Sequence, residues 1–220
     1  MGSNYNVTRI STHAIEHEFS TYAALSDAIG YVYQEEGHMF YVLNFPTADR
    51  TWVYDISSQL WHERVWLDSN GIEHRHRSNV FAYAYGSYVV GDWSNGNLYA
   101  LDQNNYTDNG TPIKRVRSFP HVVNELKRII YRKFIADMQT GAQTDPNADP
   151  PILSLRWSDD RGASWGNAIT QPLGAVGQFL QSIQFRRLGM SRDRIFELSW
   201  SSPVMTALNG AYADVEASAS

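Results

Sequence analysis

Apolar and polar residues alternate in short runs along the N-terminal half of the chain, and turn-forming residues separate the runs. The first pair of runs, Ile29–Gln34 and His38–Leu43, is joined across Glu35–Gly37. The second pair, Thr51–Asp55 and Leu60–Leu67, carries tryptophans on both arms. Alternation with a period of two is typical of strands with one buried face, and short connections favour hairpins. The pattern therefore predicts two antiparallel hairpins.

Three further runs continue the same pattern: Phe81–Tyr85, Tyr88–Trp93 and Asn97–Asp102. The dipeptide Asn95-Gly96 lies between the second and the third run. Asn and Gly both tolerate positive φ, so this dipeptide predicts a type I′ turn. The segment as a whole predicts three consecutive antiparallel strands.

The C-terminal half contains one ambiguous segment and several clearer ones. Residues 121–134 fit both a helical and a strand period, and we favour a strand from about Arg128. The clearer alternating runs predict further strands at Pro151–Trp157, Phe179–Leu188, Arg194–Trp200 and Ala207–Val215.

The spacing of these strands indicates the fold class. Turn signals recur roughly every eight to twelve residues with no convincing helix between the strands, which is typical of a sandwich, a barrel or a propeller. An aromatic-rich unit of three or four strands recurs imperfectly at about 45 residues, which favours propeller blades. We therefore expect an all-β fold, a β-propeller-like array of antiparallel three- to four-stranded blades. It forms either a ring of about four blades or a partial propeller.

The order of strands and loops along the sequence also predicts how the chain is divided into parts. Met1-Gly2-Ser3 resembles a cloning scar, and a segment rich in Asp, Asn, Pro and Gly interrupts the C-terminal half. Its composition predicts a flexible loop. The expected parts are a scar and N-terminal arm (1–8), N-terminal blades (9–139), the loop (140–151), C-terminal blades (152–216) and a tail (217–220).

A short motif in the C-terminal blades has the pattern Ser-x-Asp-x-Gly-x-Ser-Trp, which is known as an Asp-box. We expect Asp160 to accept hydrogen bonds from the turn backbone, Gly162 to take positive φ, and Trp165 to pack beside the next strand. These roles lie within the turn, so we prefer a structural interpretation to a sialidase-like glycan site. The box consists of Ser158, Asp160, Gly162, Ser164 and Trp165.

Composition limits the class of protein. Hydrophobic residues make up 43% of the 220 residues and aromatic residues 13%, which is far too much apolar surface for a disordered chain. The absence of cysteine excludes disulfides and thiolate metal sites and fits a reducing compartment. A net charge of −5 argues against a nucleic-acid-coating protein, although a local basic patch can still contact DNA. No run approaches the roughly 20 apolar residues that span a bilayer.

The sequence His74-Arg75-His76-Arg77 is a candidate metal site, because alternation places the two imidazoles on one face of an extended segment. Two imidazoles do not complete a zinc shell, and no acidic third ligand is assured. We therefore interpret the segment as a polar strand edge or a solvated loop, and we expect no metal and no cofactor.

Two pairs of adjacent carboxylates, Glu35-Glu36 and Asp159-Asp160, occur at predicted hairpin turns. Neighbouring side chains diverge there, so neither pair is a convincing acid/base dyad. The chain also lacks a nucleophile elbow, a P-loop and a dinucleotide fingerprint. We expect no catalytic residues.

Basic residues cluster on predicted strands. Guanidinium groups on rigid strands suit protein interfaces, because they pair bidentately with carboxylates and stack on aromatic rings. An ordinary solvated face is the alternative interpretation. The candidate interface residues are Arg115, Arg117, Arg132, Lys133, Arg186 and Arg187.

Several phrases of the sequence resemble a known family. Leu155–Trp165, Phe185–Gly189 and Arg192–Glu197 are similar to the C-terminal part of the packaged-DNA stabilisation proteins of short-tailed bacteriophages. Phe40–Asp55 and Leu60–Glu63 resemble the same proteins. The resemblance covers most of the chain, and its combination of motifs is fairly specific.

The resemblance implies a non-enzymatic tail hub or tail accessory protein. Such proteins are added beneath the portal after packaging, keep the genome inside, and support the tail needle and tailspikes. The expected partners are therefore the portal and adaptor, the needle, the tailspike and, for the full-length protein, further copies of itself. Because family members are longer, this chain would be a C-terminal portion or a prophage-encoded relative. It would act in the virion tail after synthesis in the host cytoplasm.

Two other functions stay open. A sialidase-like glycoside hydrolase requires arginines, carboxylates and a tyrosine that converge in one pocket. A glycan- or receptor-binding module requires exposed Trp and Tyr that stack on sugars.

Overall fold

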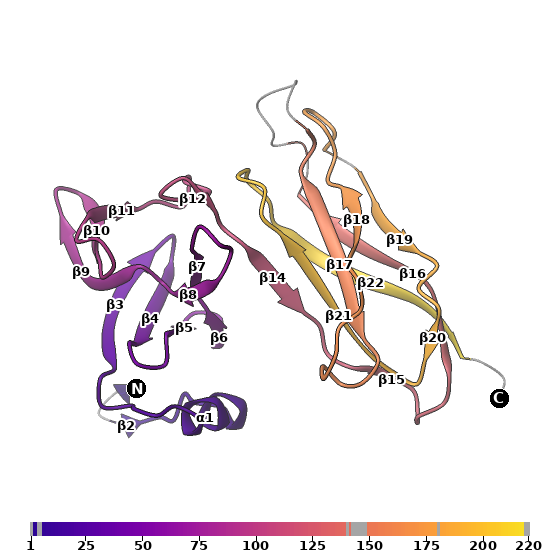
Figure 1. Cartoon of the computed structure of the whole chain (residues 1–220), viewed down its shortest axis with the longest axis horizontal. Helices are drawn as coiled ribbons and strands as arrows, with labels where there is room; N and C mark the ends of the chain where they lie inside the picture. The colour runs from indigo at the N-terminus through magenta and orange to yellow at the C-terminus, as the bar shows by residue number, and fades with distance from the viewer. Residues whose placement is uncertain (1, 4–5, 140, 142–148, 180, 218–220) are drawn as a thin grey trace. The chain divides into compact units, whose positions relative to one another are not determined.

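The computed structural model describes residues 2–3, 6–139, 141, 149–179 and 181–217 and contains two compact units (Figure 1). The N-terminal unit comprises residues 1–103 and the C-terminal unit residues 104–220. The expected division at 140–151 therefore differs from the one observed. The strand before that segment, Ile129–Met138, pairs with the strand Leu208–Ala217 after it, so the residues on both sides belong to one unit.

Parts of the expected arm, loop and tail fall outside the description of the structure. These are residues 1, 4–5, 140, 142–148 and 218–220; residue 180 is also outside it.

The N-terminal unit is built from antiparallel hairpins, as the alternation predicts. Its four-stranded sheet has the order β3-β4-β5-β6, and its three-stranded sheet has the order β11-β10-β9. Two short strands, β7 and β8, form a separate pair, as do β1 and β2. The elements are β1 (Gly2–Ser3), β2 (Asn6–Val7), α1 (His13–Ser20), β3 (Ile29–Glu35), β4 (His38–Phe45), β5 (Arg50–Asp55), β6 (Leu60–Glu63), β7 (Val65–Leu67), β8 (Glu73–Arg75), β9 (Ser78–Ala84), β10 (Ser87–Asp92) and β11 (Leu98–Leu101).

Two-residue turns with positive φ join some of these strands. Glu36 and Gly37 between β3 and β4 have φ values of 48° and 81°, as a type I′ turn requires. The prediction of such a turn at Asn95-Gly96 is wrong, since Gly96 has positive φ and Asn95 does not. The connection is longer because the carboxylate of Asp92 accepts the backbone N–H of Ser94 and holds a wider loop.

The core of the N-terminal unit lies between its two larger sheets. Val42 and Val53 are fully buried on the four-stranded sheet. Tyr31 and Tyr33 of β3 pack against Phe81 of β9, with ring centroids 5.5 Å and 5.8 Å from that of Phe81. Face-to-face packing of small antiparallel sheets through aromatic side chains is the arrangement expected of propeller blades.

The other face of the β9–β11 sheet presents small and aliphatic side chains. Val80, Gly91 and Leu98 are aligned across its three strands. A Cβ atom added to Gly91 would lie 2.9 Å from a methyl carbon of Val80. The absence of a side chain at Gly91 therefore lets Val80 lie close to the sheet.

The helix α1 is not anticipated by the strand-rich reading. The side chain of Thr12 accepts the backbone N–H of Ile15, which caps the helix, and Ile15 is buried. Phe19 packs against Phe45 with ring centroids 4.8 Å apart. Aromatic packing against β4 thus stabilises a helix of only eight residues.

The C-terminal unit contains two larger sheets. In the first, β21 pairs on one edge with β14 and then β15, and on the other with β17, which pairs with β18. In the second, β16 pairs along one edge with β22 and along the other with β19 and β20. The elements are β12 (Thr107–Asp108), β13 (Thr111–Pro112), β14 (Arg115–Ser118), β15 (Val122–Val123), β16 (Ile129–Met138), β17 (Ile152–Ser158), β18 (Ile169–Pro172), β19 (Ile183–Arg186), β20 (Met190–Ser191), β21 (Asp193–Trp200) and β22 (Leu208–Ala217).

These two sheets pack face to face as a β-sandwich. Phe134 of β16 and Phe196 of β21 come from opposite sheets, and their ring centroids are 4.9 Å apart. Leu155 and Leu198 on the first sheet and Phe185 on the second are fully buried. The strands expected to form C-terminal blades therefore form a sandwich, in which β16 confirms the strand predicted from about Arg128.

Candidate functional site

The Asp-box turn joins β17 to β18 within the sandwich unit. Asp160 accepts the backbone N–H of Ser164 (2.8 Å) and the hydroxyls of Ser164 (2.5 Å) and Ser158 (2.7 Å). The Ser158 hydroxyl oxygen in turn accepts the Gly162 N–H at 2.7 Å, and Gly162 has a φ of 94°. The bonds from Ser164 and Ser158 lower the pKa of Asp160 to about 2. The four residues thus form a closed hydrogen-bonded turn.

A buried cation lies under this turn. Arg194 of β21 is 2% exposed, and its guanidinium donates two hydrogen bonds to the Asp159 carboxylate at 2.6 Å and 2.7 Å. It also lies over the rings of Tyr131 and Trp157, at 4.4 Å and 5.1 Å from their centroids. Bidentate pairing and aromatic contact together satisfy a charge that burial would otherwise penalise. The adjacent residues Asp159 and Asp160 therefore have separate structural partners.

Trp165 contacts β17, the strand that leads into the turn, whereas the motif predicts packing beside the next strand. The Arg156 guanidinium lies 4.7 Å from the Trp165 ring centroid. Arg156 also donates to the Glu197 carboxylate at 2.6 Å, and the Ser118 hydroxyl donates to the other oxygen of Glu197 at 2.8 Å. This chain of contacts links β14, β21 and β17 to the Asp-box hairpin.

The segment His74–Arg77 has no open metal-binding face. His74 bonds to Asp49 through Nδ1 at 2.8 Å, whereas His76 bonds to Ser78 at 2.7 Å. Removal from water lowers the pKa of His76 to about 3, so its imidazole is neutral at pH 7. No group of three or more potential ligands within the described ranges is arranged to hold a metal ion.

The arginines of this segment correct its interpretation as a solvated loop. Arg75 is buried, and its guanidinium lies 4.3 Å from the Trp93 ring centroid. Arg77 lies 4.0 Å from the Trp66 ring centroid and pairs with Asp92 at 3.0 Å. Aromatic rings that lie far away in the sequence therefore cover a segment that is polar when read alone.

The candidate interface residues occupy two surfaces of the sandwich unit. Arg115 and Arg117 lie on β14 in the first sheet. Arg115 donates to the Ser202 carbonyl at 3.2 Å and lies over the Tyr106 ring. The other four are on or next to the strands of the second sheet, so the six do not form one patch. Those four are Arg132, Lys133, Arg186 and Arg187.

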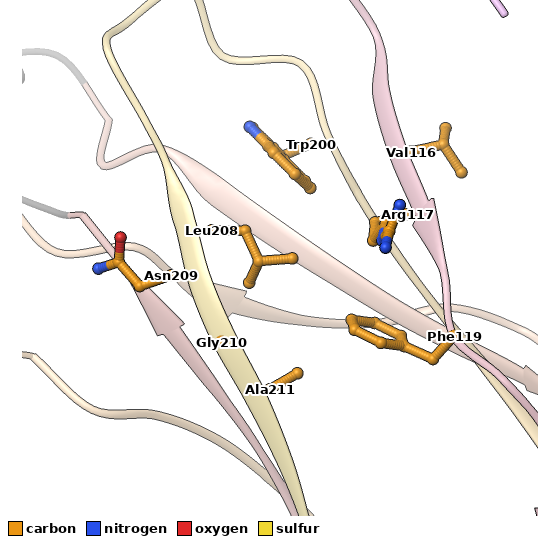
Figure 2. A pocket seen from close by; sticks show the side chains of 8 residues that line it. All are labelled: Val116, Arg117, Phe119, Trp200, Leu208, Asn209, Gly210 and Ala211. Atoms are coloured by element: carbon orange, nitrogen blue, oxygen red, sulfur yellow. The ribbon is translucent and has the colours of Figure 1, made fainter. Parts of the chain in front are cut away.

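A surface cavity of about 420 Å³ lies between β14 and β22 (Figure 2). The side chains of Phe119, Trp200 and Leu208 point into it. The sequence did not indicate these residues as a site, because they come from three separate strands or strand ends. Within its own strand, each one looks like an ordinary core residue in an alternating pattern. The complete lining is Val116, Arg117, Phe119, Trp200, Leu208, Asn209, Gly210 and Ala211.

Two family models match the two units of the chain. The one described as bacteriophage P22 Gp10, beta-propeller, matches residues 1–106, and the one described as bacteriophage P22 Gp10, beta-sandwich, matches residues 114–216. The chain belongs to the bacteriophage P22 Gp10 family. Gp10 is a packaged-DNA stabilisation protein, so the expected family is confirmed, and the chain is a phage structural protein.

Other comparisons add little to the Gp10 assignment. A comparison with curated proteins finds no match. One similar solved structure is a glycoside hydrolase family 43 arabinoxylan arabinofuranohydrolase from Bacillus subtilis in complex with cellotetraose, with 11% identity. The match covers 88% of this chain and 41% of the hydrolase, and its TM-score of 0.24 is too low to carry an argument. The Gp10 family is consistent with a non-enzymatic protein of the virion. Across the described residues, no helix is long and apolar enough to span a membrane.

Proposed function

We propose that this chain is a non-enzymatic component of the tail that attaches below the portal, seals the packaged DNA and supports the tail needle and tailspikes. The observation that carries the proposal is that both units match models of the same phage protein, one as a propeller and the other as a sandwich. The partners are the portal and adaptor proteins, the needle, the tailspike and further copies of the same chain.

The contact surface proposed for these neighbours is the solvent face of the β19-β16-β22 sheet. Arg186, Lys133 and Asp214 are aligned across the three strands. The ammonium nitrogen of Lys133 lies 3.7 Å from a carboxylate oxygen of Asp214. The guanidinium of Arg186 instead donates a hydrogen bond to the neutral amide oxygen of Gln184, at 2.9 Å. Arg186 therefore has positive charge available for an acidic surface.

Arg187 extends this surface. It follows β19 in a turn with a φ of 62° and is exposed. Arg132 pairs with Glu216 on the neighbouring strand, and both side chains are more than half exposed. Exposed pairs of this kind are weak and exchange readily with charges on a partner. On this surface the strands hold the charged residues in fixed positions, while their ion pairs can be replaced by pairs with a partner protein.

The experiment is co-sedimentation of the purified chain with portal–adaptor complexes, followed by electron microscopy of the complex. We expect a symmetric ring of chains below the adaptor. Absence of any binding to virion components, for the whole protein as well as for this chain, would remove the support for the proposal.

Charge reversal tests the surface itself. The double variant Arg186→Glu/Arg187→Glu is expected to bind the complexes about tenfold more weakly at low salt, because interfacial charges act mainly through electrostatic attraction. The matched control is Lys127→Glu, which reverses an exposed cation of the same unit outside this sheet. Equal weakening by both variants would indicate general charge effects and not this surface.

A further inference from the structure

Apolar side chains form part of the wall of the cavity between β14 and β22, beside the polar groups that line the rest. Phe119 and Leu208 point toward each other across it, and Ala211 lies beside them, whereas the Asn209 side chain points away (Figure 2). The indole N–H of Trp200 donates to the Thr206 hydroxyl at 2.9 Å, so the polar end of this ring already has a partner. These apolar side chains therefore offer a contact surface to an apolar side chain that enters the cavity.

Both strands that border the cavity have a free edge. β14 pairs only with β21, and β22 pairs only with β16, within the described part of the chain. Alternate backbone N–H and C=O groups along the outer edge of β22 therefore have no strand partner. Such an edge is a template for pairing with another extended chain.

The two halves of β22 differ in how this edge is protected. Asp214 and Glu216 lie in the second half and pair with Lys133 and Arg132 of β16. Charged side chains on an edge strand discourage unwanted pairing. The first half, Leu208–Ala211, has no charge and lines the cavity. The open part of the edge and the apolar cavity thus coincide.

Arg117 supplies a cation at the same place. It is aligned with the fully buried Leu198 of β21, so it lies on the side of β14 that faces the second sheet. Its guanidinium forms no hydrogen bond or ion pair with any residue that the structure describes, in contrast to Arg156 and Arg194, which both bind carboxylates. A guanidinium beside an apolar cavity is complementary to a carboxylate next to an apolar side chain.

We propose that this groove binds an extended acidic segment of a partner protein, which adds as a strand to the free edge of β22. One large apolar side chain of the segment fills the cavity, and a carboxylate two residues further along, on the same side of the strand, pairs with Arg117. Main-chain hydrogen bonds supply affinity in this mode, and the cavity and the cation supply specificity. The groove is separate from the surface of Arg186 and Arg187, and the inference shares with the proposed function only that the partner is a protein.

The test uses a labelled ten-residue peptide that alternates valine and threonine and carries a central phenylalanine with an aspartate two residues after it. Fluorescence anisotropy with the full chain is expected to give saturable binding. Arg117→Glu is expected to weaken it about tenfold, because it removes a charge-assisted hydrogen bond. A peptide with lysine in place of aspartate is expected to reverse this preference and bind Arg117→Glu better than the unchanged chain. Lys127→Glu is the matched control and leaves both affinities unchanged.

Hydrogen exchange locates the bound peptide. Strand addition is expected to slow amide exchange at residues 208–212 of β22. No saturable binding up to about 1 mM peptide, slowing confined to other strands, or the same loss in Lys127→Glu as in Arg117→Glu would overturn the proposal. A dimer of the chain that excludes the peptide from this edge would also overturn it, in favour of a second copy. Charge reversal at Arg186 and Arg187 leaves peptide binding intact, so the test is independent of binding to the portal complex.

Discussion

Asp160 shows how one carboxylate can organise a turn. Its oxygens accept hydrogen bonds from the hydroxyls of Ser158 and Ser164 and from the Ser164 backbone N–H. All of these bonds favour the ionised form, which is why the pKa of Asp160 is lowered to about 2. A carboxylate whose pKa is lower in the folded than in the unfolded state stabilises the fold at pH values above its unfolded pKa.

Replacing Asp160 by asparagine is therefore expected to destabilise the sandwich unit in a pH-dependent way. Asp160→Asn keeps the shape of the side chain but loses one strong acceptor for Ser164. The variant is expected to have a lower free energy of unfolding than the unchanged chain. This difference is expected to be largest at pH 7 and to shrink as pH falls from about 4 to about 2. Urea denaturation at several pH values measures it.

Asp137→Asn is the matched control for this prediction. Asp137 is an exposed carboxylate on β16 of the same unit. Its replacement is expected to change stability little, with no dependence on pH in this range. A difference for Asp160→Asn that stays constant from pH 7 to pH 2 would contradict the assigned role.

Individual residues were predictable from the sequence where their partners are local. The roles of Ser158, Asp160 and Gly162 follow from the motif because all their bonds lie within six residues of one another. The role of Arg194 does not, since its acceptor Asp159 lies 35 residues away in the sequence. The same applies to Arg75, whose aromatic cover could not be recognised from its polar neighbours.

At the scale of elements, β17 allows a direct test of the sandwich core. Leu155 in the middle of the strand is fully buried, whereas Ile152 at its start is 50% exposed. Leu155→Ala is expected to cost about 2–5 kcal/mol of unfolding free energy, through lost burial and the cavity left behind. Ile152→Ala is expected to cost about 0.5 kcal/mol. Equal losses for the two variants, measured by urea denaturation, would show that β17 does not face the core as described.

Strands were predictable from alternation, but some connections and the helix were not. The pairing of β3 with β4 places Tyr31 opposite Val42 and Tyr33 opposite Phe40 on the face that contributes to the core, which is a register that the alternation in both runs allows. The helix α1 escaped because eight residues contain too few turns for a clear helical period, and its stability comes from Phe45 far along the chain. The Asn95-Gly96 turn was misjudged because the side chain of Asp92 determines that loop.

At the scale of the whole molecule, the two units are expected to have separate unfolding transitions. The buried cluster of the sandwich draws on residues 129–198, and the cluster around Tyr33 draws on residues 33–53 of the other unit. Leu155→Ala should therefore lower the midpoint of one transition, and Val53→Ala that of the other. Calorimetry of the full chain measures both. A single transition shifted by either variant would show instead that the units unfold together.

The all-β class was predictable from the whole sequence, whereas the sandwich was not. Blades and sandwiches are both built from short antiparallel strands that alternate with a period of two. What separates them is which strands pair over long distances, such as β16 with β22, whose paired residues are at least 70 positions apart in the sequence. The cavity beside Arg117 depends on the same long-range pairing, which explains why no local signal indicated it.

The alignment of Val80, Gly91 and Leu98 on the β9–β11 sheet limits what evolution can change there. Valine branches at Cβ and has few rotamers, so it cannot readily move aside for a new methyl group at position 91. Even alanine would push the isopropyl group of Val80 outward, because its Cβ atom would lie 2.9 Å from one of the valine methyl carbons. The smoothness of that face thus rests on one missing carbon atom.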